Sequence, residues 1–240
     1  MIDKNEIIKN SINVRQQSWF NFIKYWIIDS RTRESIRVNN FLKLQFTKER
    51  QELLNQIIKQ NNFDKIKNYD ERVIAILRWV KNNLTYVSDR IQYNTVEKWD
   101  FVDEILTYWY VWKDRFRREL ILVGKGMEKP HKDAFRADDC EGGATLIWAL
   151  AVQSGVPSDR IYLFAGDVVG GGHAWVGYIS ENYPYVFFFL DWCYWYDSKH
   201  IKYRKAYLID KKDKTKILGD KKYKTLWFFT NESNTYRGKK

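Results

Sequence analysis

The strongest hydrophobic pattern in the chain is a nearly uninterrupted run of apolar and small residues that follows two aspartates, Asp138 and Asp139. A helix that is apolar on nearly all sides is usually buried. An aspartate side chain caps such a helix well, because its oxygen accepts backbone N–H groups of the first turn. The sequence therefore predicts a buried helix that begins at Cys140, with either aspartate as its N-cap, and that stops at Ser154 and Gly155.

Apolar residues at helical spacing predict further helices before this one. We expect them at residues 15–28, 48–60, 70–83 (with Asp70 as the N-cap) and 99–122. Alternating or continuous apolar runs bounded by turn residues predict strands. We expect these at residues 37–46, 161–167, 173–178, 186–192, 206–209 and 226–230. Residues 231–240 are polar and basic and are expected to form a frayed tail.

One thiol stands at a position that favours chemistry. Cys140 falls on the first turn of the predicted buried helix, where the positive end of the helix dipole favours the nucleophilic thiolate. A free cysteine is also often just a small buried apolar residue. For Cys140 taken alone, that structural role is the more common one.

A histidine and an aspartate in two later strands change that balance. His173 opens the strand after the glycine turn 170–172, and Asp191 stands inside the apolar strand 186–192, near its end. A buried carboxylate needs a partner, because an unpaired charge in apolar surroundings is costly. His173 can be that partner if the two strands are antiparallel neighbours. Cysteine, histidine and aspartate would then supply the nucleophile, the base and the group that orients the base for thiol acyl transfer.

The order of these motifs resembles the transglutaminase-like superfamily, most closely its bacterial transglutaminase-like cysteine proteinases. Two upstream segments also resemble that family: 79–89, with a helix and a Tyr-x-x-Asp turn, and 97–100, which contains a tryptophan. The likeness spans about residues 66 to 200. In chain order, the motifs that carry it are Asp139-Cys140-Glu141, a helix, Gly155-Val156-Pro157, a strand, Gly171-Gly172-His173-Ala174-Trp175-Val176, a strand, and Leu190-Asp191.

The resemblance implies an α+β fold with a papain-like, transglutaminase-like core, in which a central helix packs on an antiparallel sheet. Residues 1–65 would be a mainly helical N-terminal extension, 66–230 the cysteine peptidase core and 231–240 a basic tail. The resemblance also implies the roles of three residues in a catalytic triad. They are Cys140 as nucleophile, His173 as general base and Asp191 as orienting acid.

The activity expected from these roles is that of a cysteine-dependent amide hydrolase (a peptidase) or an acyl transferase. Both would act through a thioester acyl-enzyme on a protein or peptide substrate. The sequence does not separate hydrolysis by water from transfer to an amine, because both share that intermediate. The resemblance favours a peptidase.

Three other side chains are weaker candidates for the site. Superfamily members often use a side chain upstream of the cysteine to bind the oxyanion. The indole N–H of Trp99 suits that task beside the backbone N–H of Cys140, although core packing is the commoner role of a tryptophan. Asp197 is the alternative acid, and His131, in the basic loop 124–136, is the alternative base.

The second cysteine raises the question of a disulfide. Two cysteines do not make a disulfide framework. Cys193 lies two residues after Asp191, so it would face the same side of a strand and could lie near Cys140. A bridge between the two would inactivate the nucleophile or act as a redox off-switch. We expect a free Cys193 packed near the site.

The sequence departs from the family pattern at one position. The family usually has a second acidic residue after Cys-Glu, and this chain has Gly142. Relatives sometimes hold calcium beside the flanking carboxylates, but Asp139 and Glu141 alone offer too few oxygen ligands for Ca²⁺. We interpret them as the N-cap and a first-turn acid, and we expect no metal and no cofactor. The few Cys and His residues show no zinc-ligand spacing.

Composition adds a charge and a richness in aromatic residues. The formal net charge is +11, which allows an anionic partner such as nucleic acid, cell-wall polymer or a membrane surface. A solvated basic surface is the commoner cause. Aromatic residues make up 17% of the chain, which argues for a folded protein. The aromatic N-terminal helices are expected to pack on the core, with binding of a protein partner as the alternative.

The N-terminus lacks the basic region and apolar core of a signal peptide, and no apolar run reaches transmembrane length. We therefore expect a product that is cytoplasmic at synthesis, from a bacterial or phage genome. A second hypothesis for its function keeps the fold without the activity, because a fold alone never proves activity. The protein would then be a catalytically silent structural or binding module, for example a virion component of a phage.

Overall fold

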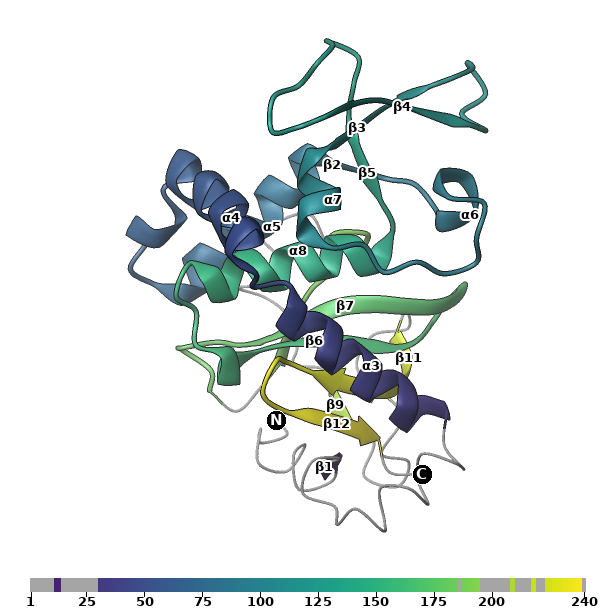
Figure 1. Ribbon diagram of the computed structural model, residues 1–240. Coiled ribbons are helices and arrows are strands. Elements are labelled where there is room, and N and C mark those ends of the chain that lie inside the picture. Colours follow the sequence, from purple (N-terminus) through teal and green to yellow (C-terminus); the bar gives the residue numbers. More distant parts are fainter. Residues whose placement is uncertain are drawn as a thin grey trace.

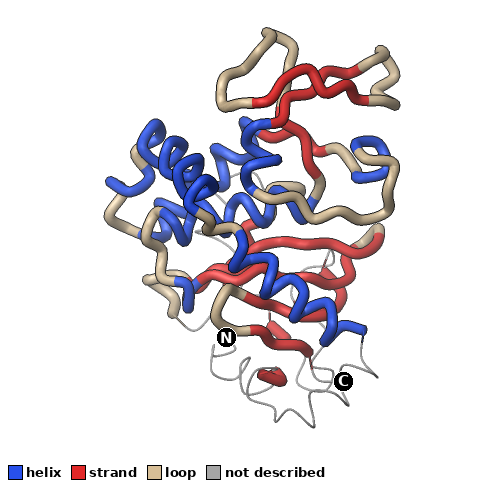
Figure 2. The backbone as a smooth tube through the Cα atoms, in the orientation of Figure 1, coloured by secondary structure: helices blue, strands red, loops and turns tan. Residues whose placement is uncertain are grey.

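The computed structural model describes residues 11–13, 30–184, 187–194, 208–209, 217–218 and 223–238. The predicted helix 15–28 and the alternative acid Asp197 lie outside these residues. The described chain combines helices with strands: one helix layer covers a face of a twisted sheet (Figures 1 and 2). No helix in this described part is both long and apolar enough to cross a membrane.

The helix at the centre of the structure is α8 (Cys140–Gln153), and it lies where the sequence predicts it. Its residues from Cys140 to Ala151 are all buried. Asp139 is the N-cap and accepts a hydrogen bond from the backbone N–H of Glu141, which decides between the two aspartates. The helix ends at Ser154, and Gly155 follows with φ of 94°, a left-handed conformation that favours glycine.

The main sheet has six strands, and every neighbouring pair is antiparallel. Helix α8 packs against β6 and β7, two strands near the middle of the sheet. Side chains alternate across these strands, so one face of the sheet meets α8 and the other face holds a separate, mostly aromatic cluster. In spatial order the strands are β1 (Ser11–Asn13), β12 (Thr235–Gly238), β11 (Tyr223–Thr230), β6 (Ile161–Val168), β7 (Gly171–Ile179) and β8 (Phe187–Leu190).

Four longer helices complete the layer around α8. Helices α4, α5 and α7 contact α8, and α3 crosses strands β11 and β12. Buried residues from all four join α8 in one hydrophobic cluster. The division into an extension up to residue 65 and a core domain after it stays a prediction. The four helices are α3 (Ser30–Leu44), α4 (Lys48–Asn61), α5 (Tyr69–Asn83) and α7 (Val102–Thr107).

Smaller elements connect these parts. Strand β2 pairs in parallel with β5, which leads directly into α8, and β3 forms a hairpin with β4 that stands away from the sheet (Figure 1). The short helices are η2 (Phe63–Lys65), α6 (Asp89–Gln92) and η3 (Ser158–Arg160). The remaining strands are β2 (Leu84–Tyr86), β3 (Tyr108–Trp112), β4 (Leu120–Lys125), β5 (Arg136–Asp138), β9 (Leu208–Ile209) and β10 (Ile217–Leu218).

Two sequence predictions name the wrong type of element. Residues 37–46 were expected to form a strand but belong mostly to helix α3, because Val38 and Leu42 lie four residues apart on one buried face. The predicted helix 99–122 is helical only in α7. The aromatic and β-branched run after it forms β3 and β4, for which these residue types have the higher propensity.

Two more corrections concern the ends of elements. Residues 231–240 were expected to be a frayed tail, but residues 235–238 form strand β12. Pairing with β11 holds this strand in the sheet. The predicted helix 70–83 is present as α5, but its N-cap is Asn68. The carboxylate of Asp70 instead accepts hydrogen bonds from the hydroxyls of Tyr178 and Ser180, both at 2.7 Å. Asp70 therefore ties the start of α5 to the end of β7.

Candidate active site

The first turn of α8 is packed so closely that two positions tolerate only glycine. A Cβ atom on Gly142 would lie 2.0 Å from the carboxyl carbon of Asp138. A Cβ atom on Gly143 would lie 1.9 Å from the indole nitrogen of Trp192. The space beside Gly142 is thus filled by the carboxyl group of Asp138, which comes from strand β5.

The register of the sheet brings His173 and Asp191 together. Val176 of β7 pairs with Leu190 of β8, so the next residue, Asp191, reaches the level of Trp175. His173 lies two residues before Trp175 and therefore on the same face of β7. The result is a hydrogen bond of 2.8 Å between Nε2 of His173 and Oδ2 of Asp191. Both side chains are almost fully buried, with exposed fractions of 6% and 0%.

The carboxylate of Asp191 is fixed by three further donors. The hydroxyl of Tyr223, on β11, donates to Oδ2 at 2.6 Å. The backbone N–H groups of Cys193 and Tyr194 donate to Oδ1 at 2.9 and 3.3 Å. Both oxygens are therefore satisfied, and the carboxylate can hold the imidazole ring in one orientation.

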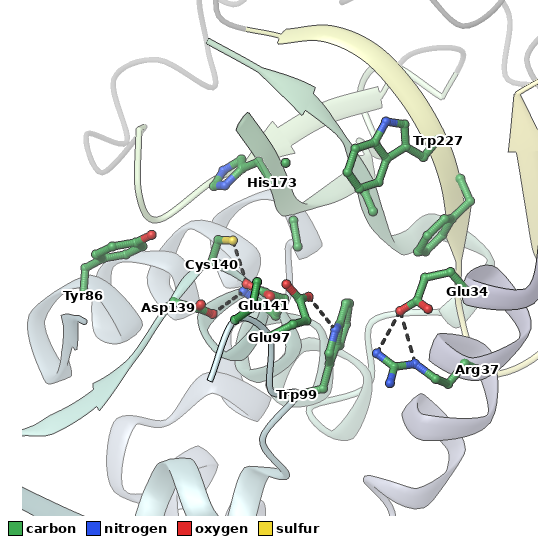
Figure 3. Close-up of a pocket in the computed structure, with 15 residues that line it drawn as sticks. Glu34, Arg37, Tyr86, Glu97, Trp99, Asp139, Cys140, Glu141, His173 and Trp227 are labelled. Atoms are coloured by element: carbon green, nitrogen blue, oxygen red, sulfur yellow. Dashed lines mark hydrogen bonds and ion pairs between the residues drawn. The ribbon is translucent and has the colours of Figure 1, made fainter. Parts of the chain in front are cut away.

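A cavity of about 540 Å³ opens between the start of α8 and the strands, and both Cys140 and His173 line it (Figure 3). The sulfur of Cys140 lies on the side of its helix that is turned toward the ring of His173. Nε2 of His173 is occupied by Asp191, so Nδ1 is the ring nitrogen left for a proton from the thiol. The other walls come from segments distant in sequence, among them Glu34, Tyr86, Glu97, Trp99 and Trp227.

Acidic side chains dominate the surroundings of the thiol. Burial, and then the neighbouring carboxyl groups of Glu141 and Asp139, raise the pKa of Cys140 well above its usual value, while the backbone N–H of Ala174 lowers it. This opposes the effect expected from the helix dipole alone. Burial and hydrogen bonds to Asp139 and Glu97 raise the pKa of Glu141 to about 11, so this carboxyl group holds its proton at neutral pH. Oε2 of Glu141 lies 2.7 Å from the sulfur.

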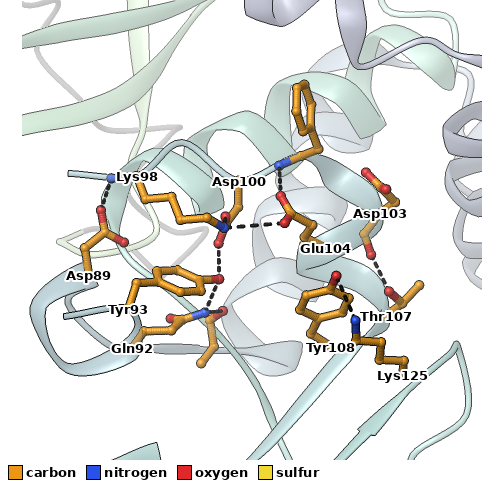
Figure 4. Close-up of polar contacts among 12 residues, drawn as sticks. Asp89, Gln92, Tyr93, Lys98, Asp100, Asp103, Glu104, Thr107, Tyr108 and Lys125 are labelled. Carbon is orange, nitrogen blue, oxygen red and sulfur yellow. Dashed lines mark hydrogen bonds and ion pairs between the residues drawn. The ribbon is translucent and has the colours of Figure 1, made fainter. Parts of the chain in front are cut away.

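A second group of buried carboxyl groups lies behind the first turn of α8. Burial raises the pKa of Asp138 and of Asp100, and it raises that of Asp89 to about 7 with a further contribution from Asp139. Figure 4 shows the network around them: Lys98 and the hydroxyl of Tyr93 both donate to Asp100, and the backbone N–H of Lys98 donates to Asp89. This network anchors the loop that carries Glu97 and Trp99 into the cavity wall.

The weaker candidates are found in different places. The indole N–H of Trp99 donates to Glu97 at 2.9 Å, although the ring does line the cavity. His131 lies in an exposed loop, where its Nδ1 accepts from the backbone of Asp133. Cys193 is a free thiol, as is Cys140, and its sulfur lies within 4.8 Å of a ring nitrogen of His173 and an oxygen of Asp191.

Among the described residues, two groups of side chains have the donor atoms for a metal ion. In the first, Asp139, Cys140 and Glu141 place one ligand atom each within 4.8 Å of one another. The second consists of His173, Asp191 and Cys193. Oxygen ligands suit hard cations such as Ca²⁺, whereas histidine and cysteine suit zinc. The side chains of the first group, and those of His173 and Asp191 in the second, already take part in the hydrogen bonds described above.

Sequence reasoning missed two important neighbours. Tyr223 lies 32 positions after Asp191 and carries no motif, so only the pairing of β11 in the sheet reveals it. Tyr86 stands at the cavity mouth, 54% exposed, beside the ring of Trp192 at 5.9 Å between centroids. Its position as the tyrosine of the Tyr-x-x-Asp turn is the sequence feature that could have indicated a place near the site. Burial and the nearby thiols and carboxylates raise the pKa of Tyr86.

Comparison with known proteins gives a distant likeness in fold. No protein-family model and no curated protein matches the chain. The solved structures that it resembles at a distance include those of LapG from Legionella pneumophila. The EGTA-treated form is 16% identical over 86% of both chains with a TM-score of 0.40, and the calcium-bound form is 15% identical over 87% and 88% with a TM-score of 0.37.

Proposed function

We propose that this protein is a cysteine-dependent amide hydrolase, a peptidase, or an acyl transferase that acts on a protein or peptide substrate. Cys140 is the nucleophile, His173 the general base and Asp191 the acid that orients the base. One observation carries the proposal: the 2.8 Å hydrogen bond from His173 to Asp191 lies at the wall of the cavity that Cys140 also lines.

The reaction begins with transfer of the thiol proton from Cys140 to Nδ1 of His173. The sulfur attacks the carbonyl carbon of an amide and forms a tetrahedral intermediate. When that intermediate collapses, the C–N bond breaks and His173 returns the proton to the leaving amine. Water then attacks the thioester to give an acid and restore the thiol, or an amine attacks it to give a new amide.

The raised pKa of the Cys140 thiol indicates the protonation state of the site between turnovers. A thiol with a raised pKa is mostly protonated at neutral pH. His173 therefore acts as a base during attack, and the site does not store a separated thiolate–imidazolium pair. The backbone N–H of Cys140, at the start of α8, is one donor for the oxyanion. Trp99 becomes a second donor only if its N–H leaves Glu97.

A second candidate function is a catalytically silent module with the same fold. The burial of Cys140, with 8% of the residue exposed, and its acidic surroundings favour this candidate, because both disfavour the nucleophilic thiolate. The two candidates differ in one property. In an enzyme the reactivity of the thiol depends on His173, whereas in a silent module it does not.

Labelling with iodoacetamide across pH 6 to 9, followed by mass spectrometry, separates the two. An enzyme predicts that the labelling of Cys140 depends on His173, so that H173N slows it at least tenfold at pH 7. C193S serves as the control that removes the neighbouring thiol without touching the triad. Labelling of Cys140 that is unchanged in H173N would establish the silent module.

A further inference from the structure

The β3–β4 hairpin presents an unpaired strand edge. It stands away from the main sheet (Figure 1), and among the described strands β4 pairs with β3 alone. The backbone N–H of Lys113 donates to the carbonyl of Glu119 at 2.9 Å. Hydrogen-bonding direction alternates along an antiparallel strand. Leu120 and Leu122 therefore turn their backbone N–H and C=O groups toward the open side of the hairpin.

This edge is also apolar. Three consecutive residues of β4 are exposed: Ile121 at 44%, Leu122 at 43% and Val123 at 40%. An exposed, hydrophobic edge strand is a template for pairing with another chain, and proteins usually block it with charge, proline or a covering element. None of the residues from Leu120 to Val123 is charged or a proline.

Positive charges stand at both ends of the apolar segment. Arg117 and Arg118 precede it and Lys125 follows it, and all three are exposed. No carboxylate of the described residues forms an ion pair with Arg117 or Arg118. The carboxylate of Glu119, the residue after Arg118, is bound by Lys113 at 2.7 Å.

From this edge we infer that β4 is a docking site for an extended segment of another protein, with apolar side chains at its centre and Asp or Glu toward both ends. The segment adds to the hairpin as a third strand. Its backbone bonds Leu120 and Leu122, its apolar side chains cover the exposed residues of β4, and its carboxylates meet the cations at the two ends.

The same charges disfavour a second copy of this chain as the occupant. Two β4 strands paired antiparallel would place Arg117 and Arg118 of one copy beside Lys125 of the other. The chain as a whole carries a formal net charge of +11, which adds to that repulsion.

The test uses the full chain and three fluorescent eight-residue peptides. The first has two glutamates at each end and alternating valine and threonine between them. The second replaces every glutamate with lysine, and the third keeps the glutamates but carries N-methyl groups on its central peptide bonds. Fluorescence polarisation should show the first peptide binding at least tenfold tighter than the other two, and more weakly as salt rises.

The variant R117E/R118E should reduce binding of the acidic peptide at least tenfold. K65E/K67E makes the same change of charge at a distant surface between α4 and α5 and should bind normally. Circular dichroism confirms that both variants are folded. The inference is overturned if the acidic peptide does not bind, if the methylated peptide binds equally well, or if R117E/R118E binds as the unmodified protein does. Dimerisation through β4, or binding to phosphatidylserine vesicles in place of the peptide, would also overturn it.

Discussion

The hydroxyl of Tyr223 donates a 2.6 Å hydrogen bond to Oδ2 of Asp191, the same oxygen that lies 2.8 Å from Nε2 of His173. Tyr223 is 1% exposed, so this bond is shielded from water. A donor on that oxygen withdraws negative charge from the interaction with the imidazole. Tyr223 is therefore a positioning residue that also tunes the base, through Asp191 and without touching the substrate.

Replacing Tyr223 with phenylalanine tests this role. Loss of the donor leaves more negative charge facing His173, which favours the protonated ring. Alkylation of Cys140 that depends on His173 should then begin at higher pH, measured as the pH dependence of iodoacetamide labelling.

Y178F is the matched control for Y223F, because it removes another buried tyrosine hydroxyl bound to a carboxylate, that of Asp70. Both variants should lose about 1 to 2 kcal/mol of stability with the hydrogen bond. Only Y223F should move the pH profile. An equal shift in both variants, or in neither, would assign Tyr223 a purely structural role.

Charge beside the thiol can be removed without disturbing the helix cap. In D139N an amide oxygen still caps α8, because asparagine is as good an N-cap as aspartate. Loss of the charge of Asp139 should lower the pKa of Cys140, so labelling should begin at lower pH. E141Q should have a smaller effect between pH 7 and 9, since the pKa of Glu141 is about 11 and the group is already neutral. Equal shifts in the two variants would contradict this assignment of the proton.

Gly142 should be intolerant of even a methyl group. A Cβ atom there would lie 2.0 Å from the carboxyl carbon of Asp138. Overpacking of this kind costs about 1 to 3 kcal/mol, against which alanine gains about 1 kcal/mol in helix propensity. Urea unfolding should therefore show G142A to be less stable. In D138A the space is vacated, so the cost of G142A should be largely relieved in the double variant. If the losses of stability in G142A and D138A simply add in the double variant, the methyl group does not clash with Asp138.

The stability of the protein should depend on pH through Asp89. Burial raises its pKa in the folded chain to about 7, above the value of about 3.9 in an unfolded chain. The folded state thus binds the proton more tightly, and stability contributed by this group is complete below about pH 4 and is lost as pH rises through 7. D89N, which stays neutral, should gain melting temperature relative to the unmodified protein between pH 4 and 8. D64N, at an exposed aspartate, is the control. A difference in melting temperature between D89N and the unmodified protein that does not change with pH would refute the raised pKa of Asp89.

Sequence by itself determined the elements whose cause is local. The apolar run after the two aspartates fixes α8, and Gly155 fixes its end, because helix formation and left-handed turns depend on a few neighbouring residues; the structure chose Asp139 over Asp138 as the cap. The apolar runs around His173 and before Asp191 likewise fix two strands. The prediction that these two residues meet followed once the strands were taken as neighbours, and the register confirms that contact.

Tertiary structure alone decided what depends on distant segments. Residues 108–112 and 120–125 form strands, although the spacing of their apolar residues predicts a helix. Pairing across the hairpin outweighs that weak local preference for a helix. The carboxyl groups beside the thiol belong to its chain neighbours Asp139 and Glu141, but the burial of Cys140 and the donor from Tyr223 come from strands and loops far away in sequence. Burial and neighbouring charge set a pKa, and both arise only when the chain folds. The sequence could therefore place the thiol at the helix dipole but could not show how strongly its environment opposes the thiolate.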